Sequence, residues 1–197
     1  SEKPKVLHAL AGKPLLQHVL DCAAELKPQQ ICVVYGHGGE AVPKAMQEYS
    51  AKFAIPTQFV IQAPQLGTGH AVQQAMPHLS DDGNTLVLYG DVPLVQYSTL
   101  HQMQQAGSGL VLLTINLDNP TGYGRILRNE QGDVLGIVEE KEATPEQREI
   151  QEVNTGILLA PTKDLRGWLA KLQNKNSQGE YYLTDIVSMA VQQGVAV

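Results

Sequence analysis

The chain has 197 residues, with 14 Lys and Arg against 20 Asp and Glu, and its formal net charge is −6. A chain of this size buries about 70% of its unfolded surface. We therefore expect one domain over residues 1–197 that needs neither a disulfide nor a structural metal. The acidic balance and the lack of basic clusters argue against binding to nucleic acid or to an anionic membrane surface.

Signals for localisation are few. No segment approaches the ~18 consecutive apolar residues of a membrane span, and no leader sequence is recognisable, which favours the cytoplasm. Cys22 and Cys32 lack metal-ligand spacing and lie in apolar segments, as is typical of buried free thiols in a reducing compartment. Because the chain begins at Ser1 with no strand before its first predicted helix, we expect a fragment of a longer protein.

The first part of the chain alternates helical patterns with short apolar runs. The helical patterns cover residues 15–26, 41–53 and 98–106, and one further helix opens at Thr68. The apolar runs that predict strands cover residues 31–35, 57–62, 85–89 and 110–115. Near-continuous apolar strands that alternate with helices are typical of a parallel sheet with helices on both faces.

The pattern changes after Pro120. Residues 124–128 and 134–139 flank a turn at Gly132 and predict an antiparallel hairpin. Beyond it we expect a capping box from Thr144 to Gln147, a strand over 153–159, and helices over 165–172 and from Thr184. The whole chain is interpreted as an α/β fold with a doubly wound, Rossmann-like sheet that is mixed and mostly parallel.

In such sheets ligands lie beyond the carboxyl ends of the strands. The loop from Gln62 to His70 lies at one such end, and its glycines allow backbone N–H groups to approach an anionic ligand at a helix start. It has neither the P-loop nor the dinucleotide-binding fingerprint. The alternative is that Thr68 is an ordinary N-cap beside a tight turn.

The segment from Tyr89 through Gly90 to Asp91 follows another predicted strand. A carboxylate there could hold Mg²⁺ together with substrate phosphates, although a turn-capping Asp is an equal alternative. Lys5 is one of three lysines near the amino end that are candidate phosphate partners or simply solvated side chains. The glycine-rich loop over residues 119–125 is either a lid or, more simply, the entry to a hairpin.

Other features point to ordinary structure. The chain has no serine-hydrolase, zinc-protease or Cys–His–Asn pattern, and its 6 His residues are scattered. The acidic stretch 139–152 is interpreted as a solvated face, and Trp168 as part of the core.

Seven motifs occur together in one order: Lys3-Pro-Lys-Val-Leu7, Gln62-x-x-Gln-Leu-Gly-Thr-Gly-His-Ala71, Tyr89-Gly-Asp-Val-Pro-Leu94, Gly122-Tyr-Gly-Arg125, Ile137-Val-Glu139, Asn154-Thr-Gly156 and Gly179-Glu-Tyr-Tyr-x-Thr-Asp185. In these motifs the chain resembles the uridyltransferase domain of the bacterial bifunctional N-acetylglucosamine-1-phosphate uridyltransferase/glucosamine-1-phosphate acetyltransferases. The resemblance extends from Lys3 to about Gly194.

The resemblance implies roles for individual residues. It implies that Lys5 contacts phosphate and that Asp91 is the Mg²⁺ ligand, with Tyr89 and Gly90 lining the same site. It implies a uracil-recognition segment made of Gln62, Gly67 and Thr68. The N-acetylglucosamine moiety would be held by Gly124, Glu139 and Asn154.

The implied reaction joins UTP and N-acetylglucosamine 1-phosphate to give UDP-N-acetylglucosamine, a precursor of peptidoglycan and lipopolysaccharide, and pyrophosphate. A phosphate oxygen of the sugar phosphate attacks the α-phosphorus of UTP, and no general base is needed because a phosphate monoester with a second pKa near ~6 is already anionic at pH 7. The remaining alternatives are another sugar 1-phosphate nucleotidyltransferase and a non-catalytic nucleotide-sugar binding module. The missing glycine fingerprint contradicts a Rossmann-type dehydrogenase.

The resemblance also implies parts that this sequence does not contain. The family's first strand and its Leu-Ala-Ala-Gly-x-Gly-Thr-Arg phosphate loop would precede Ser1. A second Mg²⁺ ligand, an Asn, and a left-handed β-helix acetyltransferase domain would follow Val197. We therefore expect a parent protein that is a homotrimer through its β-helix domain, and at most weak turnover by residues 1–197 alone.

Overall fold

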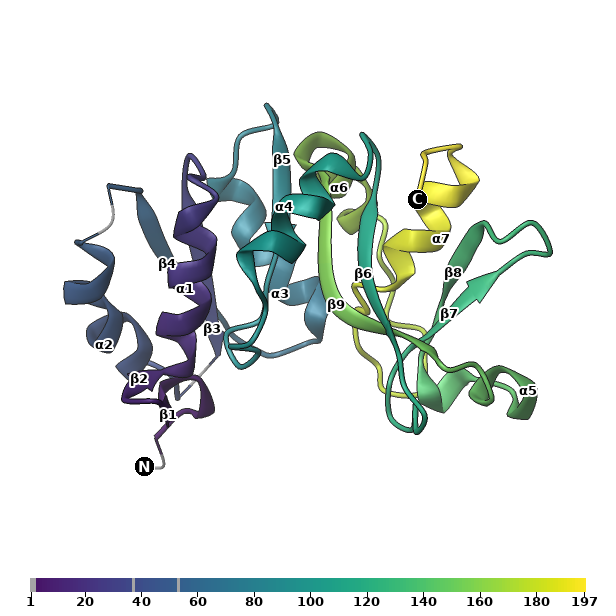
Figure 1. Ribbon diagram of the computed structural model, residues 1–197, viewed down its shortest axis with the longest axis horizontal. Helices are drawn as coiled ribbons and strands as arrows, with labels where there is room; N and C mark the ends of the chain where they lie inside the picture. Colours follow the sequence, from purple (N-terminus) through teal and green to yellow (C-terminus); the bar gives the residue numbers. More distant parts are fainter. Residues whose placement is uncertain (1–2, 37, 53) are drawn as a thin grey trace.

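A computed structural model describes residues 3–36, 38–52 and 54–197 of the chain (Figure 1). The helices are α1 (Leu15–Glu25), α2 (Ala41–Ser50), α3 (Thr68–Ala75), α4 (Tyr97–Gln105), α5 (Pro145–Arg148), α6 (Thr162–Leu169) and α7 (Asp185–Gln192). Short 3₁₀ helices are η1 (Lys5–Leu7), η2 (Met76–His78) and η3 (Glu140–Glu142). The strands are β1 (Ala9–Leu10), β2 (Lys13–Pro14), β3 (Ile31–Gly36), β4 (Thr57–Gln62), β5 (Asn84–Val87), β6 (Val111–Asn116), β7 (Arg125–Arg128), β8 (Val134–Val138) and β9 (Glu152–Pro161).

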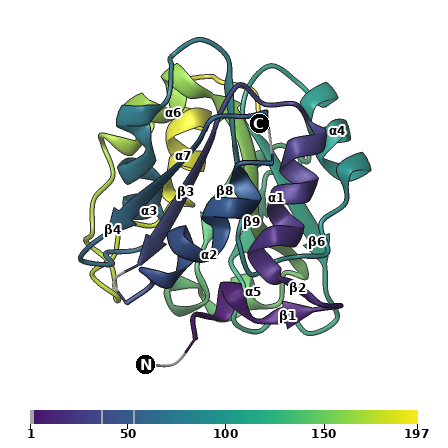
Figure 2. The same ribbon diagram turned by 90° about the vertical axis from the view of Figure 1, so that its left-hand side faces the viewer.

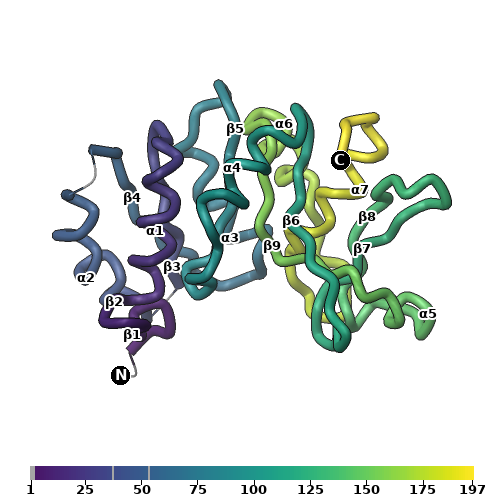
Figure 3. Tube along the Cα trace, in the orientation of Figure 1, coloured from purple at the N-terminus to yellow at the C-terminus, as the bar shows by residue number. Residues whose placement is uncertain are grey.

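The strands pair in both directions. β3 and β4 are parallel, from Ile31 opposite Thr57 to Gly36 opposite Gln62. In the five-stranded sheet, β9 lies between β5 and β6 and is antiparallel to each, so β5 and β6 run parallel to one another on its two sides. The hairpin of β7 and β8 joins β9 and lies at the opposite end of the molecule from β3 and β4 (Figure 3). The predicted mixed α/β fold is confirmed, and so is the predicted hairpin.

Helices cover both faces of the structure because β9 presents apolar side chains alternately to each face. Leu158 and Ala160 pack into a core with residues of α3, α6 and α7. Ile157 and Leu159 pack into a second core with residues of α1 and α4. The same division is visible in Figure 2, where α1 and α4 lie on one side of β9 and α3, α6 and α7 on the other. This two-sided covering is the doubly wound arrangement that the apolar strands predict.

The core residues confirm the expectation for Trp168, and for Cys22 and Cys32 they confirm in part the expectation of buried free thiols. Trp168 is 1% exposed, and its indole Nε1 donates a hydrogen bond to Gln193 Oε1 at 2.8 Å. Cys22 is buried and Cys32 partly buried, both are free thiols, and burial raises the pKa of each, with Glu25 adding to the rise at Cys22. In the part of the chain that the structure describes, no helix is long and apolar enough to span a bilayer.

Several element boundaries differ from the predictions by one to three residues, as in α6, which covers Thr162–Leu169 where 165–172 was predicted, and the short strands β1 and β2 are not among the predicted elements. α2 ends at Ser50, and Phe53, the predicted last residue of that helix, lies outside the described residues. β5 ends at Val87, which pairs with Leu158 of β9, two residues before the predicted end at Tyr89. At that point Gly156 has a φ of +90°, and the pairing of β6 with β9 shifts register between Leu112 and Thr114. The resulting bend in β9 makes room for the cavity described next.

Candidate nucleotide-sugar site

A cavity of about 100 Å³ lies at the bend of β9. Its polar lining comes from residues far apart in the sequence: Thr68, Tyr89, Glu139, Asn154 and Thr184. The first four were predicted as site residues, so the fold brings together candidates from the start of α3, the end of β5, the end of β8 and the middle of β9. Phenol, carboxylate, amide and hydroxyl groups in one cavity can pair with both donors and acceptors of a hydroxyl-rich ligand.

The Tyr89 ring has room in this cavity because Gly156 has no side chain. A Cβ at Gly156 would lie only 2.6 Å from Tyr89 Cε2 and 2.9 Å from its hydroxyl oxygen. Burial raises the pKa of the Tyr89 phenol, and the carboxylates of Glu139 and Asp91 raise it further. Tyr89 is therefore a neutral group at pH 7, able to donate a hydrogen bond as well as to accept one.

The Glu139 carboxylate has a fixed position. Its Oε1 accepts a hydrogen bond from the Thr184 hydroxyl at 2.9 Å. Its Oε2 lies against Gly124, where a Cβ would come within 3.5 Å of it. Gly124 is also tied to the adjacent strand, because its carbonyl oxygen accepts from the backbone N–H of Asn154 at 2.9 Å. The three predicted sugar-binding residues, Gly124, Glu139 and Asn154, are thus mutual neighbours.

The loop between β4 and α3 holds the predicted uracil-recognition residues. Gln62 is 7% exposed, and its Nε2 donates to the carbonyl oxygen of Gly67 at 3.0 Å. The alternative that Thr68 is an N-cap is wrong, since Gly67 occupies the cap position of α3. The Thr68 hydroxyl instead accepts a hydrogen bond from the backbone N–H of Leu183 at 3.1 Å. Backbone bonds from Gly69 N to Tyr181 O and from Tyr181 N to Leu66 O, both 2.8 Å, fasten the loop to the segment before α7.

Lys5 and Asp91 form a separate, exposed pair. The ammonium Nζ of Lys5 lies 3.5 Å from Asp91 Oδ2, and the two side chains are 73% and 40% exposed. Gly90 lies beneath this pair, where a Cβ would come within 3.2 Å of atoms of Val6 and Leu16. Within the described residues no group of three or more His, Cys, Asp or Glu could hold a metal ion on its own. A carboxylate with few protein partners is compatible with Mg²⁺, which commonly takes one or two carboxylates and completes its shell with water and substrate phosphates.

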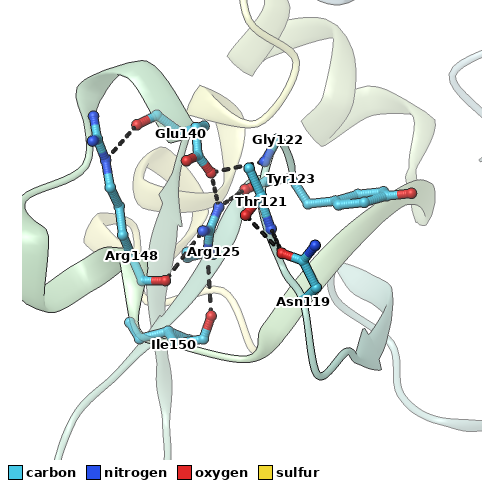
Figure 4. Close-up of polar contacts among 8 residues, drawn as sticks. All are labelled: Asn119, Thr121, Gly122, Tyr123, Arg125, Glu140, Arg148 and Ile150. Atoms are coloured by element: carbon cyan, nitrogen blue, oxygen red, sulfur yellow. Dashed lines mark hydrogen bonds and ion pairs between the residues drawn. The ribbon is translucent and has the colours of Figure 1, made fainter.

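The loop over residues 119–125 is the entry to a hairpin, and buried Arg125 fastens it (Figure 4). Arg125 is 1% exposed, forms an ion pair with Glu140, and donates to the carbonyl oxygens of Tyr123, of Arg148 at 3.1 Å and of Ile150 at 3.2 Å. The same Glu140 carboxylate accepts the backbone N–H of Gly122 at 2.9 Å. This network fixes the backbone on both sides of Gly124 and Glu139.

The interpretation of residues 139–152 as a solvated face is wrong in part. Glu140 holds Arg125, and Glu152 pairs with Arg128 at 2.7 Å while also accepting from Thr114 at 2.8 Å. Hydrogen bonds from these partners lower the pKa of both carboxyl groups, with Arg125 the main cause at Glu140 and Arg128 at Glu152. The partners come from β6 and β7, so the acidic pattern alone could not reveal them.

Sequence reasoning also missed Gly156, Thr184 and His70 as contributors to the site. Each lies within a motif that carried the family resemblance, but none of the three had been assigned a role. Their roles depend on contacts across the fold, with Tyr89, Glu139 and Gln62 respectively.

Comparisons with known proteins identify the family and relatives of this chain. The family model for the MobA-like NTP transferase domain matches residues 1–140. The protein named Bifunctional protein GlmU of Herminiimonas arsenicoxydans is 58% identical over 199 residues, covering 100% of this chain and 42% of that protein. The one of Azoarcus sp. (strain BH72) is 57% identical over 196 residues, covering 98% of this chain and 42% of that protein. The chain thus spans less than half the length of these relatives.

Solved structures show the same fold at low sequence identity. A UDP-glucose pyrophosphorylase complexed with UDP-glucose superposes with a TM-score of 0.76 at 15% identity, covering 98% of this chain and 80% of the other. A putative glucose-1-phosphate thymidylyltransferase from Bacillus anthracis in complex with a sucrose has a TM-score of 0.76 at 18% identity, covering 98% of this chain and 76% of the other.

Proposed function

The chain belongs to the MobA-like NTP transferase family, and on that premise we propose that it forms UDP-N-acetylglucosamine and pyrophosphate from UTP and N-acetylglucosamine 1-phosphate. The observation that carries the proposal is the cavity at the bend of β9, where Tyr89, Glu139 and Asn154 lie together with the first residue of α3. The similarity to the two GlmU proteins over the whole chain supports the choice of substrates.

The sugar subsite is the polar part of that cavity. The Glu139 carboxylate accepts hydrogen bonds from sugar hydroxyls, while the Asn154 amide can both donate and accept. Thr184 and Gly124 hold Glu139 from two sides. A preset carboxylate loses little conformational freedom when a ligand binds, which favours a polar ligand of defined shape.

The base subsite is the loop between β4 and α3. The Gln62 side chain and the backbone of Gly67 and Thr68 supply amide groups at the end of a strand, where a uracil ring can find both donors and acceptors. Hydrogen bonds to residues 181 and 183 keep this loop in place before any ligand arrives.

The phosphates lie at Lys5 and Asp91. The Lys5 ammonium neutralises phosphate charge, and Asp91 would hold Mg²⁺, which supplies further charge neutralisation when bound. An oxygen of the sugar phosphate then forms a bond to the α-phosphorus of UTP as the bond to the β-phosphate oxygen breaks, and pyrophosphate leaves with that electron pair. Alignment of the two anionic substrates, rather than proton transfer, is the contribution required of the protein.

The test is a pyrophosphate-release assay on the full-length gene product with Mg²⁺. It pairs UTP, dTTP, CTP and ATP in turn with N-acetylglucosamine 1-phosphate and with glucose 1-phosphate. We expect the highest kcat/KM for UTP with N-acetylglucosamine 1-phosphate. A higher value for another pair would replace the proposed substrates. Calorimetric binding of UDP-N-acetylglucosamine without any turnover would make the protein a non-catalytic binding module.

A further inference from the structure

We infer that His70 is a positioning residue that fixes the orientation of the Gln62 amide, so that Gln62 presents an oxygen and not an NH₂ group to the base. The inference rests on the proposed function, in which Gln62 contacts the base of the nucleotide. It goes further by stating which atom of Gln62 is available and which neighbour decides this, and it predicts how the protein separates UTP from CTP.

Two acceptors hold the nitrogen of the Gln62 amide. Nε2 lies 3.0 Å from the carbonyl oxygen of Gly67 and 2.9 Å from Nδ1 of His70. A backbone carbonyl can only accept, so the nitrogen end of the amide must face Gly67. The amide NH₂ has two hydrogens, and the second one points to His70, whose Nδ1 must then be the unprotonated ring nitrogen.

The oxygen of the same amide has no such partner. In the part of the chain that the structure describes, no hydrogen bond reaches Gln62 Oε1, and no buried side-chain nitrogen or oxygen lacks a partner. The oxygen of this largely buried side chain is therefore its solvent-accessible polar atom. It can only accept a hydrogen bond.

The His70 ring is itself held in place. It stacks on Tyr181 with ring centroids 6.2 Å apart and an interplanar angle of 29°. The backbone oxygen of His70 accepts from Gln74 Nε2 at 3.0 Å, and the same amide nitrogen lies 3.3 Å from the second ring nitrogen of His70. Tyr181 is fastened in turn by backbone bonds to Leu66 and Gly69. A neutral imidazole has one acceptor nitrogen, so with Nδ1 accepting from Gln62 at 2.9 Å the other ring nitrogen carries the hydrogen, and the 3.3 Å approach of Gln74 Nε2 is not a hydrogen bond to the ring.

An acceptor at this position distinguishes the two pyrimidines. Uracil carries a hydrogen on N3 that can be donated to Gln62 Oε1, whereas N3 of cytosine is a lone-pair acceptor that would face another acceptor. A rotated amide would present its NH₂ group and favour cytosine. Because Gly67 alone still favours the same orientation, loss of the His70 acceptor removes part of the discrimination, and we expect about a tenfold effect, the equivalent of one hydrogen bond.

The experiment compares His70→Phe with His70→Asn in the full-length gene product. Phe keeps an aromatic ring beside Tyr181 but has no acceptor, while the Asn Oδ1 can take the place of Nδ1. Steady-state kinetics with UTP and with CTP give the ratio of the two kcat/KM values. We expect His70→Phe to lower the UTP/CTP ratio about tenfold through the KM for UTP, to leave the KM for the sugar phosphate unchanged, and to be rescued by His70→Asn.

Two results would overturn the inference. One is an unchanged UTP/CTP ratio in His70→Phe. An equal loss of kcat/KM with both nucleotides is such a case and would mean that His70 has a structural role. The other is a wild-type ¹⁵N spectrum that shows the proton of the His70 ring on Nδ1, a measurement that needs no ligand or variant. A wild-type protein without any preference for UTP would instead refute the proposed function, so the two failures are distinguishable.

Discussion

The loop between β4 and α3 and the Lys5–Asp91 pair are built in opposite ways. In the loop, Gln62, Thr68 and Gly69 are engaged in hydrogen bonds of 2.8–3.1 Å, two of them to residues more than a hundred positions away. Lys5 and Asp91 meet at 3.5 Å with most of the Lys5 side chain in solvent. The proposed base subsite is assembled by the fold, whereas the proposed phosphate end is assembled by charges that a ligand can rearrange.

Because of this difference, some residues of the proposed site can be changed without loss of stability, whereas others cannot. An exposed ion pair contributes about 0–1 kcal/mol to folding, so the phosphate end can be altered without harm to the fold. Residues around the cavity at the bend of β9 are packed against each other, so changes there affect both folding and ligand binding. Four substitutions, each with a control or a counterpart variant, test that division, and they follow in order of expected effect.

Asp91→Ala should have the largest effect on activity. Loss of the carboxylate removes the proposed Mg²⁺ ligand, and we expect turnover in the full-length gene product to fall at least ~100-fold, while the thermal midpoint stays the same. The matched control is Asp21→Ala, since Asp21 pairs with Lys13 at 2.7 Å on the surface and is 35% exposed. Wild-type turnover in Asp91→Ala would show that this residue is not a metal ligand. A large drop in thermal midpoint would contradict the view that the Lys5–Asp91 pair contributes little to stability.

Gly156→Ala should damage the cavity and the fold together. The added Cβ would lie 2.6 Å from the Tyr89 ring, at a φ of +90° that L-residues rarely adopt. We expect a loss of about 3 kcal/mol in the free energy of unfolding and a large loss of UDP-N-acetylglucosamine binding by calorimetry.

Gly132→Ala is the control for this prediction. Gly132 has a φ of +87° in the β7–β8 turn, but a Cβ there meets nothing within 4 Å. Strain alone should cost about 1–2 kcal/mol and leave ligand binding intact. Equal losses of stability in the two variants would show that contact with Tyr89 is unimportant.

Thr184→Val should affect the sugar alone. The valine keeps the shape of the side chain but cannot donate to Glu139, which then loses its fixed orientation. We expect the KM for N-acetylglucosamine 1-phosphate to rise about tenfold, the effect of one hydrogen bond, with an unchanged KM for UTP. Thr184→Ser should restore the wild-type value. A rise in both KM values would point to a general disturbance of the cavity.

The sequence predicts the parts of this molecule that depend on neighbours along the chain. Sequence patterns locate the strands from β3 to β9 and the α-helices but not β1, β2 or the 3₁₀ helices. The capping box at Thr144 forms as predicted, with the Gln147 N–H donating to the Thr144 hydroxyl at 3.2 Å. Periodicity cannot report how strands are ordered, so the place of β9 between β5 and β6 is a result of the structure.

The candidate site divides in the same way. Residues at or just after strand ends, such as Gln62 and Tyr89, are recognisable because strand ends are where ligands bind in α/β folds. Their partners His70 and Gly156 act through contacts made only after folding. The carboxylates of the acidic stretch show the limit most clearly, since the sequence does not reveal that buried Arg125 lies beneath Glu140.

Asp185→Asn should give the smallest change. It measures how much the charge of Asp185, which lies near Glu139, destabilises the folded protein. Burial raises the pKa of Asp185, and the neighbouring Glu139 and Glu142 raise it further. A folded-state pKa above the unfolded value means that the carboxylate opposes folding as pH rises through that pKa. Asn removes this penalty, so the thermal midpoint should increase by at most a few degrees at pH 7, and the gain should vanish below the unfolded Asp pKa of about 3.9.

Glu152→Gln should change the thermal midpoint in the opposite direction. The hydrogen bond from Arg128 lowers the Glu152 pKa in the folded protein, so its carboxylate supports folding above the unfolded Glu pKa of about 4.3, and this support is lost as pH falls through the folded pKa. Gln should therefore lower the thermal midpoint at pH 7 and match the wild type in acid. If both variants shifted the thermal midpoint in the same direction at pH 7, the charge of Asp185 beside Glu139 would not be what destabilises the folded protein.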